Sequence, residues 1–208
     1  MGKKLGEFNI QNVKYALKNI NGGYDAPVAF DTFAQSMSKE ANFDVLDLYG
    51  DGRLQARLPN DKGLTGNLGL MAVSENYEKA MGRLIEVEGG LAEIAQTSIV
   101  EHALYIEVNY AEKDEPVKIA KCWYYGVTSE KADGNIQQNT DSPNINGIEY
   151  PITISGTRLK KADGFTDARD TKTGNYIYVL KMTSFPNDDG YDNFEYAVPI
   201  PKEKAVSE

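Results

Sequence analysis

Apolar and polar residues alternate with a period of two along most of the chain, which is the pattern of β-strands with one buried face. The clearest case is residues 148–157, where Ile148, Tyr150, Ile152 and Ile154 fall on one side and Glu149 begins the other. The same period predicts strands over residues 102–110, 117–127, 176–182 and 193–200, and earlier ones over 13–17, 43–49, 53–58 and 64–73. We therefore predict an all-β fold, a β-sandwich or barrel-like domain of about eight or more strands.

One segment has the period of an amphipathic α-helix instead. Its apolar side chains recur three and four residues apart, and Ser74 stands where a helix N-cap is expected. Two consecutive glycines, Gly89 and Gly90, end the region. We predict one flanking α-helix near residues 75–86, with an apolar face made of Tyr77, Ala80, Met81, Leu84 and Ile85.

Long polar connections separate several of these elements. Residues 128–147, 160–174 and 187–190 are rich in Asp, Asn and Gly, which favour turns. No break in the pattern divides the chain into two domains. The sequence predicts an N-terminal arm over residues 1–12, a single domain over 13–200 and a C-terminal tail over 201–208.

The composition narrows the possible functions. The 208 residues include 22 Lys and Arg against 31 Asp and Glu, a formal net charge of −9, with one His and one Cys. One Cys makes no internal disulfide, and one His with one Cys is too few for a zinc site of Cys and His ligands. An acidic chain lacks the basic surface that grips nucleic-acid phosphates. The apolar runs are too short to span a bilayer, and we expect no secretory signal.

Few residues suggest chemistry. Gly50-Asp51-Gly52 starts like a dinucleotide-binding fingerprint, but Gln55 stands where the third glycine belongs and no helix follows, so we predict a hairpin turn. His102 begins a strand with no nucleophile motif nearby, so we expect it to be packed rather than catalytic. Among 31 acids nothing selects a catalytic carboxylate pair. We predict that the chain is not an enzyme and needs no cofactor.

Thirteen tyrosines leave two interpretations open. Tyrosine suits strands, cores near a surface and contacts between subunits. The alternative is an exposed aromatic surface around Trp123, Tyr124 and Tyr125 that binds carbohydrate. The chain would then be a non-catalytic carbohydrate- or receptor-binding module of a virion or cell surface. Cys122, beside these residues, is expected to be a small buried side chain.

The order of these pieces resembles the major tail proteins of siphophages that infect Gram-positive bacteria, the tail tube proteins. The likeness covers residues 9–160 best, and the ordered set carries it rather than any single piece. The set consists of NVKYAL at 12–17, APV at 26–28, YGDG at 49–52, GLTGNLGL at 63–70 running into the helix at 76–84, ALYIEV at 103–108, KCWYYGV at 121–127 and YPITISGT at 150–157.

This resemblance implies a β-sandwich subunit with a flanking helix that assembles, six copies to a ring, into stacked rings. The rings would form the tail tube of the virion, a conduit for the genome, built in the host cytoplasm. Implied partners are further copies, the tape-measure protein and the tail terminator and distal tail proteins. An arm or hairpin would reach the next ring. The candidates are residues 1–12 and the hairpin around 46–64, whose turn is Tyr49, Gly50, Asp51, Gly52 and Arg53.

DNA would pass through the lumen of such a tube without specific binding. A lumen of net negative charge repels phosphate at short range. Glu107 and Glu149 both lie on the polar side of strongly patterned strands. We therefore predict them as lumen-facing acids.

Overall fold

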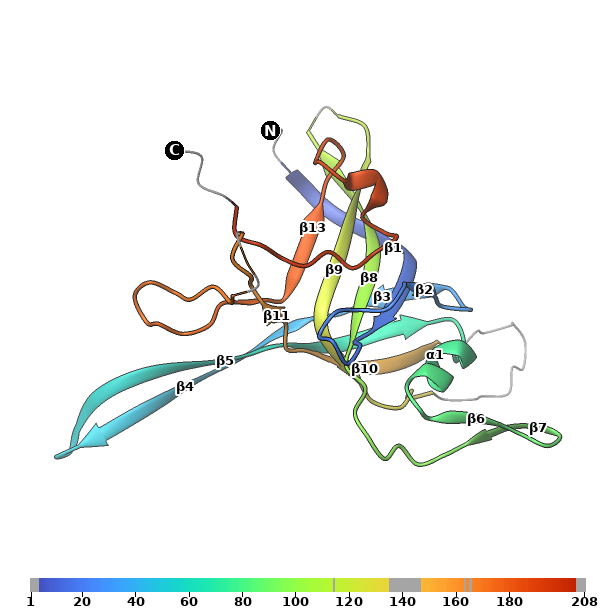
Figure 1. The fold of residues 1–208 in the computed structure, drawn as a ribbon, viewed down its shortest axis with the longest axis horizontal. Helices are drawn as coiled ribbons and strands as arrows, with labels where there is room; N and C mark the ends of the chain where they lie inside the picture. Colours follow the sequence, from blue (N-terminus) through green and yellow to red (C-terminus); the bar gives the residue numbers. More distant parts are fainter. Residues whose placement is uncertain (1–3, 114, 135–146, 163, 165, 205–208) are drawn as a thin grey trace, which may run out of the picture.

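The computed structural model describes residues 4–113, 115–134, 147–162, 164 and 166–204 (Figure 1). These residues are mostly strand, which confirms the all-β fold. A nine-stranded antiparallel sheet has the order β2-β1-β8-β9-β10-β5-β3, with β4 added to β5 and β13 to β9. Its strands are β1 (Lys4–Leu17), β2 (Val28–Ala29), β3 (Ala34–Met37), β4 (Glu40–Gly50), β5 (Arg53–Leu70), β8 (His102–Glu112), β9 (Lys118–Ser129), β10 (Ile148–Ile154) and β13 (Lys181–Ser184).

The main core lies on the concave side of this sheet, because β1 and β3 approach each other although they are far apart in strand order. Strands contribute every second residue to it, as the alternation predicts. Tyr77 from the helix is fully buried there and packs edge-on against Tyr15 and Tyr150. The other members include Leu68, Leu70, Leu104, Tyr124, Ile152 and Ile154.

A second core lies on the opposite face of β8 and β9. Trp123 and Tyr125 are fully buried there under the C-terminal segment, residues 185–204. The Trp123 indole Nε1 donates a hydrogen bond of 2.7 Å to the Phe194 carbonyl, and the Tyr125 hydroxyl donates one of 2.8 Å to the Pro199 carbonyl. Both faces of these central strands are therefore buried.

The C-terminal segment corrects the strand predicted over residues 193–200. It contains the 3-10 helix η1 (Tyr191–Asn193) and then crosses the sheet over residues 194–200 without forming a strand. Phe194 and Val198 face the second core as the predicted alternation requires, but Tyr196 and Ile200 of the same set are 67% and 50% exposed. Alternation along the sequence therefore predicted neither the conformation of this segment nor its buried side correctly.

The helix is shorter than predicted. Helix α1 (Glu75–Ala80) ends before Gly82, whose φ of 68° turns the chain away. Leu84 and Ile85, which we assigned to the helix, begin β6 (Leu84–Val87), and this strand pairs with β7 (Gly90–Glu93). Ser74 does stand at the N-cap, but its hydroxyl donates to the Asn76 side chain instead of capping the helix.

The two predicted terminal extensions pack on the domain where they are described. Residues 4–12 form the first part of β1, in register with β8, so this stretch is not a free arm. Residues 201–204 lie against Lys160, whose backbone N–H donates to the Pro201 carbonyl and whose carbonyl accepts from Glu203. Residues 1–3 and 205–208 lie outside the described residues, as do 135–146 of the predicted loop 128–147. The small sheet of β11 (Thr157–Arg158) and β12 (Tyr178–Val179) flanks the described part of the 160–174 connection.

Candidate assembly surfaces

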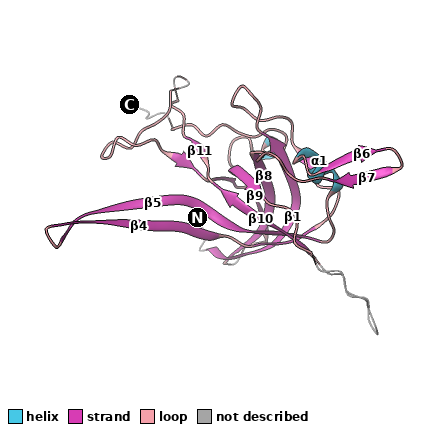
Figure 2. Ribbon diagram, turned by 90° about the horizontal axis from the view of Figure 1, so that it is seen from below, coloured by secondary structure: helices cyan, strands magenta, loops and turns pink. Residues whose placement is uncertain are grey.

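The hairpin of β4 and β5 extends from the body as a long two-stranded ribbon (Figures 1 and 2). Strand β5 pairs with β10 only over residues 64–70. From Gly63 outward to the tip of the hairpin, the described residues of β4 and β5 pair only with each other. We call residues 43–61 the distal ribbon. Both of its edges and both of its faces are therefore open, and such an isolated ribbon is marginally stable in water.

Apolar side chains stand exposed on both faces of the distal ribbon. On one face, which we call the Leu46 face, Leu46 lies opposite Leu58 and Leu48 opposite Ala56. Leu46 is 55% exposed in this chain. The other face carries Phe43, Val45, Tyr49, Leu54 and Pro59 around the Asp47–Arg57 ion pair, which is 2.9 Å long. Exposed apolar surface of this extent, gathered on one element, marks an interaction site.

The predicted turn lies at the tip of this ribbon. Asp51 and Gly52 have φ values of 52° and 73°, the conformation of a tight hairpin turn. Tyr49 is 71% exposed, and the side chain of Gln55, at a bulge in β5, donates to the Gly50 carbonyl. The hairpin turn is confirmed, while the contact of Tyr49, Gly50, Asp51, Gly52 and Arg53 with another ring stays a prediction. The sequence analysis did not single out the leucines behind the tip. A signal was present, because apolar residues there occupy both of the alternating sets of strand positions, which face opposite sides.

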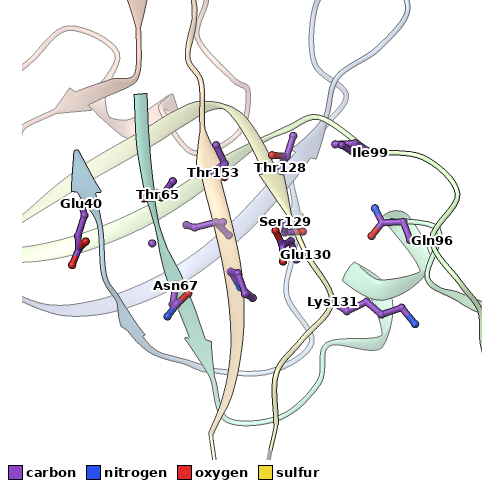
Figure 3. Close-up of a pocket in the computed structure, with 13 residues that line it drawn as sticks. Glu40, Thr65, Asn67, Gln96, Ile99, Thr128, Ser129, Glu130, Lys131 and Thr153 are labelled. Atoms are coloured by element: carbon purple, nitrogen blue, oxygen red, sulfur yellow. The ribbon is translucent and has the colours of Figure 1, made fainter. Parts of the chain in front are cut away.

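A polar face covers the outer side of β5, β10 and β9 (Figure 3). Thr128, Thr153 and Thr65 stand side by side in register on these three strands, and Glu40 of β4 continues the row. This face is hollowed by about 710 Å³ and also carries Asn67 and Glu130. Lys131 at its rim is paired with Glu93 at 2.6 Å. The hollow is thus lined by hydroxyl and carboxylate side chains together with the apolar Ile99, Pro151 and Ile152.

The two predicted lumen acids have different surroundings. Glu149 is exposed beside this polar face and accepts a hydrogen bond of 3.1 Å from Asn67. Glu107 is only 8% exposed, because the C-terminal segment covers its side of β8. Its carboxylate accepts hydrogen bonds from Gln11, Asn12 and Tyr105. Glu107 is therefore held inside this chain, and Glu149 is the acid of the two that can face a lumen.

The residues considered for chemistry are packed in the core. His102 is fully buried and lies 3.0 Å from the Tyr77 hydroxyl, and burial lowers the pKa of its imidazole to about 4. Cys122 is also buried. Within the described part of the chain, no group of three or more His, Cys, Asp and Glu side chains is placed to hold a metal ion. None of the helices described there is long and apolar enough to cross a membrane.

The aromatic surface required by the carbohydrate-binding alternative is not present at the predicted residues. Trp123, Tyr124 and Tyr125 are all buried, two in the second core and Tyr124 in the main core. Their rings therefore cannot stack on a sugar. The observation that suggested this alternative is explained by packing on both faces of β9.

No protein-family model matches the chain, and no curated protein matches it. Among solved structures, a chain in the cryo-EM structure of the anti-feeding prophage baseplate, symmetrised sixfold, matches 74% of this chain and 93% of its own length. The sequence identity is 10% and the TM-score is 0.39. A likeness of this size carries no argument about fold or function.

Proposed function

We propose that the chain is a structural, non-catalytic subunit of a phage tail that assembles as stacked hexameric rings into the tail tube. The observation that carries this proposal is the distal ribbon, which exposes apolar side chains on both faces and leaves both edges unpaired within the described chain. A surface of this kind is stabilised when another copy covers it. The order of sequence motifs along residues 9–160 supports the same class of protein.

In this proposal the polar face of β5, β10 and β9 lines the lumen. Its threonine row offers hydroxyls without positive charge, and Glu40 and Glu149 add negative charge. A duplex meets no lysine or arginine row there, so it slides without specific binding. The tape-measure protein would occupy the same channel, and the tail terminator and distal tail proteins would meet the tube ends. The site of action is the virion tail, assembled in the host cytoplasm.

The test is assembly of the purified chain, followed by size-exclusion chromatography and electron microscopy at rising protein concentration. The unaltered chain should form rings or tubes. Leu46→Asp should abolish them with an unchanged melting temperature, because Leu46 contacts no core in the single chain. Ile20→Asp is the matched control, since Ile20 is fully exposed on a turn far from the ribbon. A chain that stays monomeric at every concentration, with or without tape-measure protein, would contradict the proposal.

A further inference from the structure

One part of this acidic chain is basic. Residues 157–178 and 201–204 hold seven Lys and Arg against four Asp and Glu, a formal charge of +3, so the rest of the chain carries −12 within the total of −9. The described residues of the two segments lie together, because the Lys160 backbone N–H donates to the Pro201 carbonyl and the Lys160 carbonyl accepts from Glu203. We call them the basic lobe.

Most of the positive charge of the basic lobe is not neutralised within the chain. Arg158 and Lys160 share the single carboxylate of Asp167, at 2.9 and 2.6 Å, and Lys161 pairs with Glu203 at 3.3 Å. The other four bases are exposed and form no ion pair with any described residue. They are Arg169, Lys172, Lys202 and Lys204. The lobe therefore attracts an acidic partner.

The basic lobe is held in a fixed shape. The guanidinium carbons of Arg158 and Arg169 lie 4.1 and 3.8 Å from the centre of the Tyr176 ring, an arrangement in which cation–π attraction restrains all three side chains. Beside them the surface is hollowed by about 380 Å³, with Lys160 and the half-exposed Tyr178 among the lining residues. A preformed recess of this kind loses little entropy when a partner docks in it.

An exposed turn of the same chain has the complementary charge. From residue 182 to residue 201 the sequence holds four acids and no Lys or Arg. Three of these acids, Asp188, Asp189 and Asp192, are exposed within residues 187–192, which we call the acidic turn. Asp188 accepts a hydrogen bond of 2.8 Å from the Phe185 backbone N–H and so helps to fix the turn. Asp189 and Asp192 form no ion pair with any described residue and are free to meet a base.

Other acidic segments on the surface are less suited to this role. Four of their carboxylates already pair with a base of the same chain, namely Asp44, Asp47, Glu86 and Glu93. The unpaired acids of the polar face line a hollow rather than a projecting turn. The acidic turn therefore combines unpaired charge with a shape that can enter the recess of the basic lobe.

We infer that the basic lobe of one copy binds the acidic turn of the next copy. In Figure 1 the acidic turn (red, leading into η1) lies at the top of the domain, apart from β11 of the basic lobe, so one chain does not join its own two surfaces. The contact is therefore head-to-tail and repeats around a ring or along a filament. It also offsets the repulsion between copies that each carry −9. The inference rests on the proposed function and names a pair of surfaces that joins the subunits.

Charge reversal in the acidic turn tests this contact. D189K/D192K should raise the critical concentration for assembly by about tenfold or more, because it places Lys against the basic lobe. It does so although it reduces the net charge from −9 to −5, which by itself favours association. D25K/E88K is the matched control, since it changes the net charge equally at two exposed acids outside the turn and should not weaken assembly. Full assembly by D189K/D192K, or an equal loss in the control, would overturn the inference.

A complementary change in the basic lobe tests the pairing itself. K172E/K204E should also lose assembly, and an equimolar mixture with D189K/D192K should restore it. Every contact between the unlike variants again joins bases to acids, on both sides of each chain. Unchanged circular dichroism and melting temperature control for folding. A mixture that assembles no better than its components would overturn the inference.

Carbodiimide cross-linking of the unaltered chain tests the contact independently of tube formation, because this reagent joins an amine to a carboxylate only where the two touch. In a mixture of ¹⁵N-labelled and unlabelled chains, mass spectrometry should find lysines of the basic lobe joined to acids of the acidic turn of the other copy. Failure to form rings or tubes overturns the proposed function, whereas absence of these cross-links overturns this inference whether or not tubes form. Binding of a fluorescent DNA duplex that is lost in K172E/K204E, without cross-links between copies, would assign the lobe to nucleic acid instead.

Discussion

Lys14 and Glu195 form an ion pair 2.6 Å long, although 181 residues separate them in sequence. Glu195 also accepts hydrogen bonds from Asn12 and Lys121, each 3.2 Å long. These contacts join β1 and β9 to the C-terminal segment above the buried Trp123. The Lys14–Glu195 ion pair therefore holds the C-terminal segment in place over the second core.

Glu195→Gln should lower the free energy of unfolding by about 1–3 kcal/mol at neutral pH, because charge-assisted hydrogen bonds are lost. The Lys14 ammonium holds the pKa of the Glu195 carboxyl down to about 2. Its stabilisation is present above the unfolded-state pKa of about 4.3 and is lost as the pH falls toward 2. Urea unfolding of both proteins across this range should show their difference shrinking on acidification. An equal difference at every pH would contradict this role of Glu195.

Period-two alternation located most of the strands but did not show what covers each face. Glu107 and Trp123 both lie on the side of the sheet covered by the C-terminal segment, so a side that looks polar in β8 is buried. The covering segment itself alternates and was predicted as a strand. Its position depends on contacts such as Lys14–Glu195, which join residues far apart in sequence and leave no local pattern.

Local chemistry was more informative where a few neighbouring residues decide the conformation. Asp51 and Gly52 favour a tight turn regardless of their surroundings, and the turn was predicted correctly. The helix was predicted too long because the apolar Leu84 and Ile85 continue its spacing. Gly82 ends it, aided by the burial of Arg83 against Ser129, which is a tertiary contact. The sequence did not show that the leucines of the distal ribbon are exposed. Their exposure indicates a partner outside the chain, and a partner outside the chain leaves no pattern within it.

The two acids predicted for the lumen should behave differently when truncated. Glu107→Ala should destabilise the chain by about 1–3 kcal/mol, because it leaves the buried hydroxyl of Tyr105 without its acceptor. Glu149→Ala should change stability by less than about 0.5 kcal/mol, since Glu149 is exposed. Thermal unfolding of both variants measures this. Equal losses of stability in the two variants would mean that the buried position of Glu107 does not contribute to the stability of the chain.

Gly66 and Gly6 form a matched pair for substitution by alanine. A Cβ atom at Gly66 would overlap the backbone carbonyl of Ser38, whereas one at Gly6 would meet no atom within 4 Å. Gly66→Ala should therefore cost about 1–3 kcal/mol through overpacking. Gly6→Ala should stay within about 0.5 kcal/mol of the unaltered chain. Denaturant midpoints at constant slope provide the measurement, and a stable Gly66→Ala chain would show that β5 can move away from Ser38.

Removing most of the distal ribbon should leave the domain folded. Residues 45–59 would be replaced by Asn-Gly, which joins the cross-strand neighbours Asp44 and Asn60 by a tight turn. None of the deleted side chains is buried in either core, so stability should change by less than about 1 kcal/mol. Size-exclusion chromatography and melting curves test the fold, and electron microscopy should show no tubes. A shortened chain that still forms tubes would show that the ribbon is not needed for assembly.

His102 should make the domain less stable as the pH falls through the mildly acidic range. Burial lowers the pKa of its imidazole from 6.5 to about 4, and the Arg83 charge acts in the same direction. Between these values the unfolded chain binds the proton more readily, so the free energy of unfolding should fall by up to about 1.4 kcal/mol per pH unit. Burial raises the pKa of the neighbouring Glu78 carboxyl, which acts in the opposite direction.

The variant His102→Gln tests this prediction, because it keeps a hydrogen-bonding side chain near Tyr77 and removes the titration of the imidazole. The difference in unfolding free energy between the two proteins should therefore change between about pH 6.5 and pH 4 and be constant above it. A difference that is independent of pH would place the protonation of His102 outside this range.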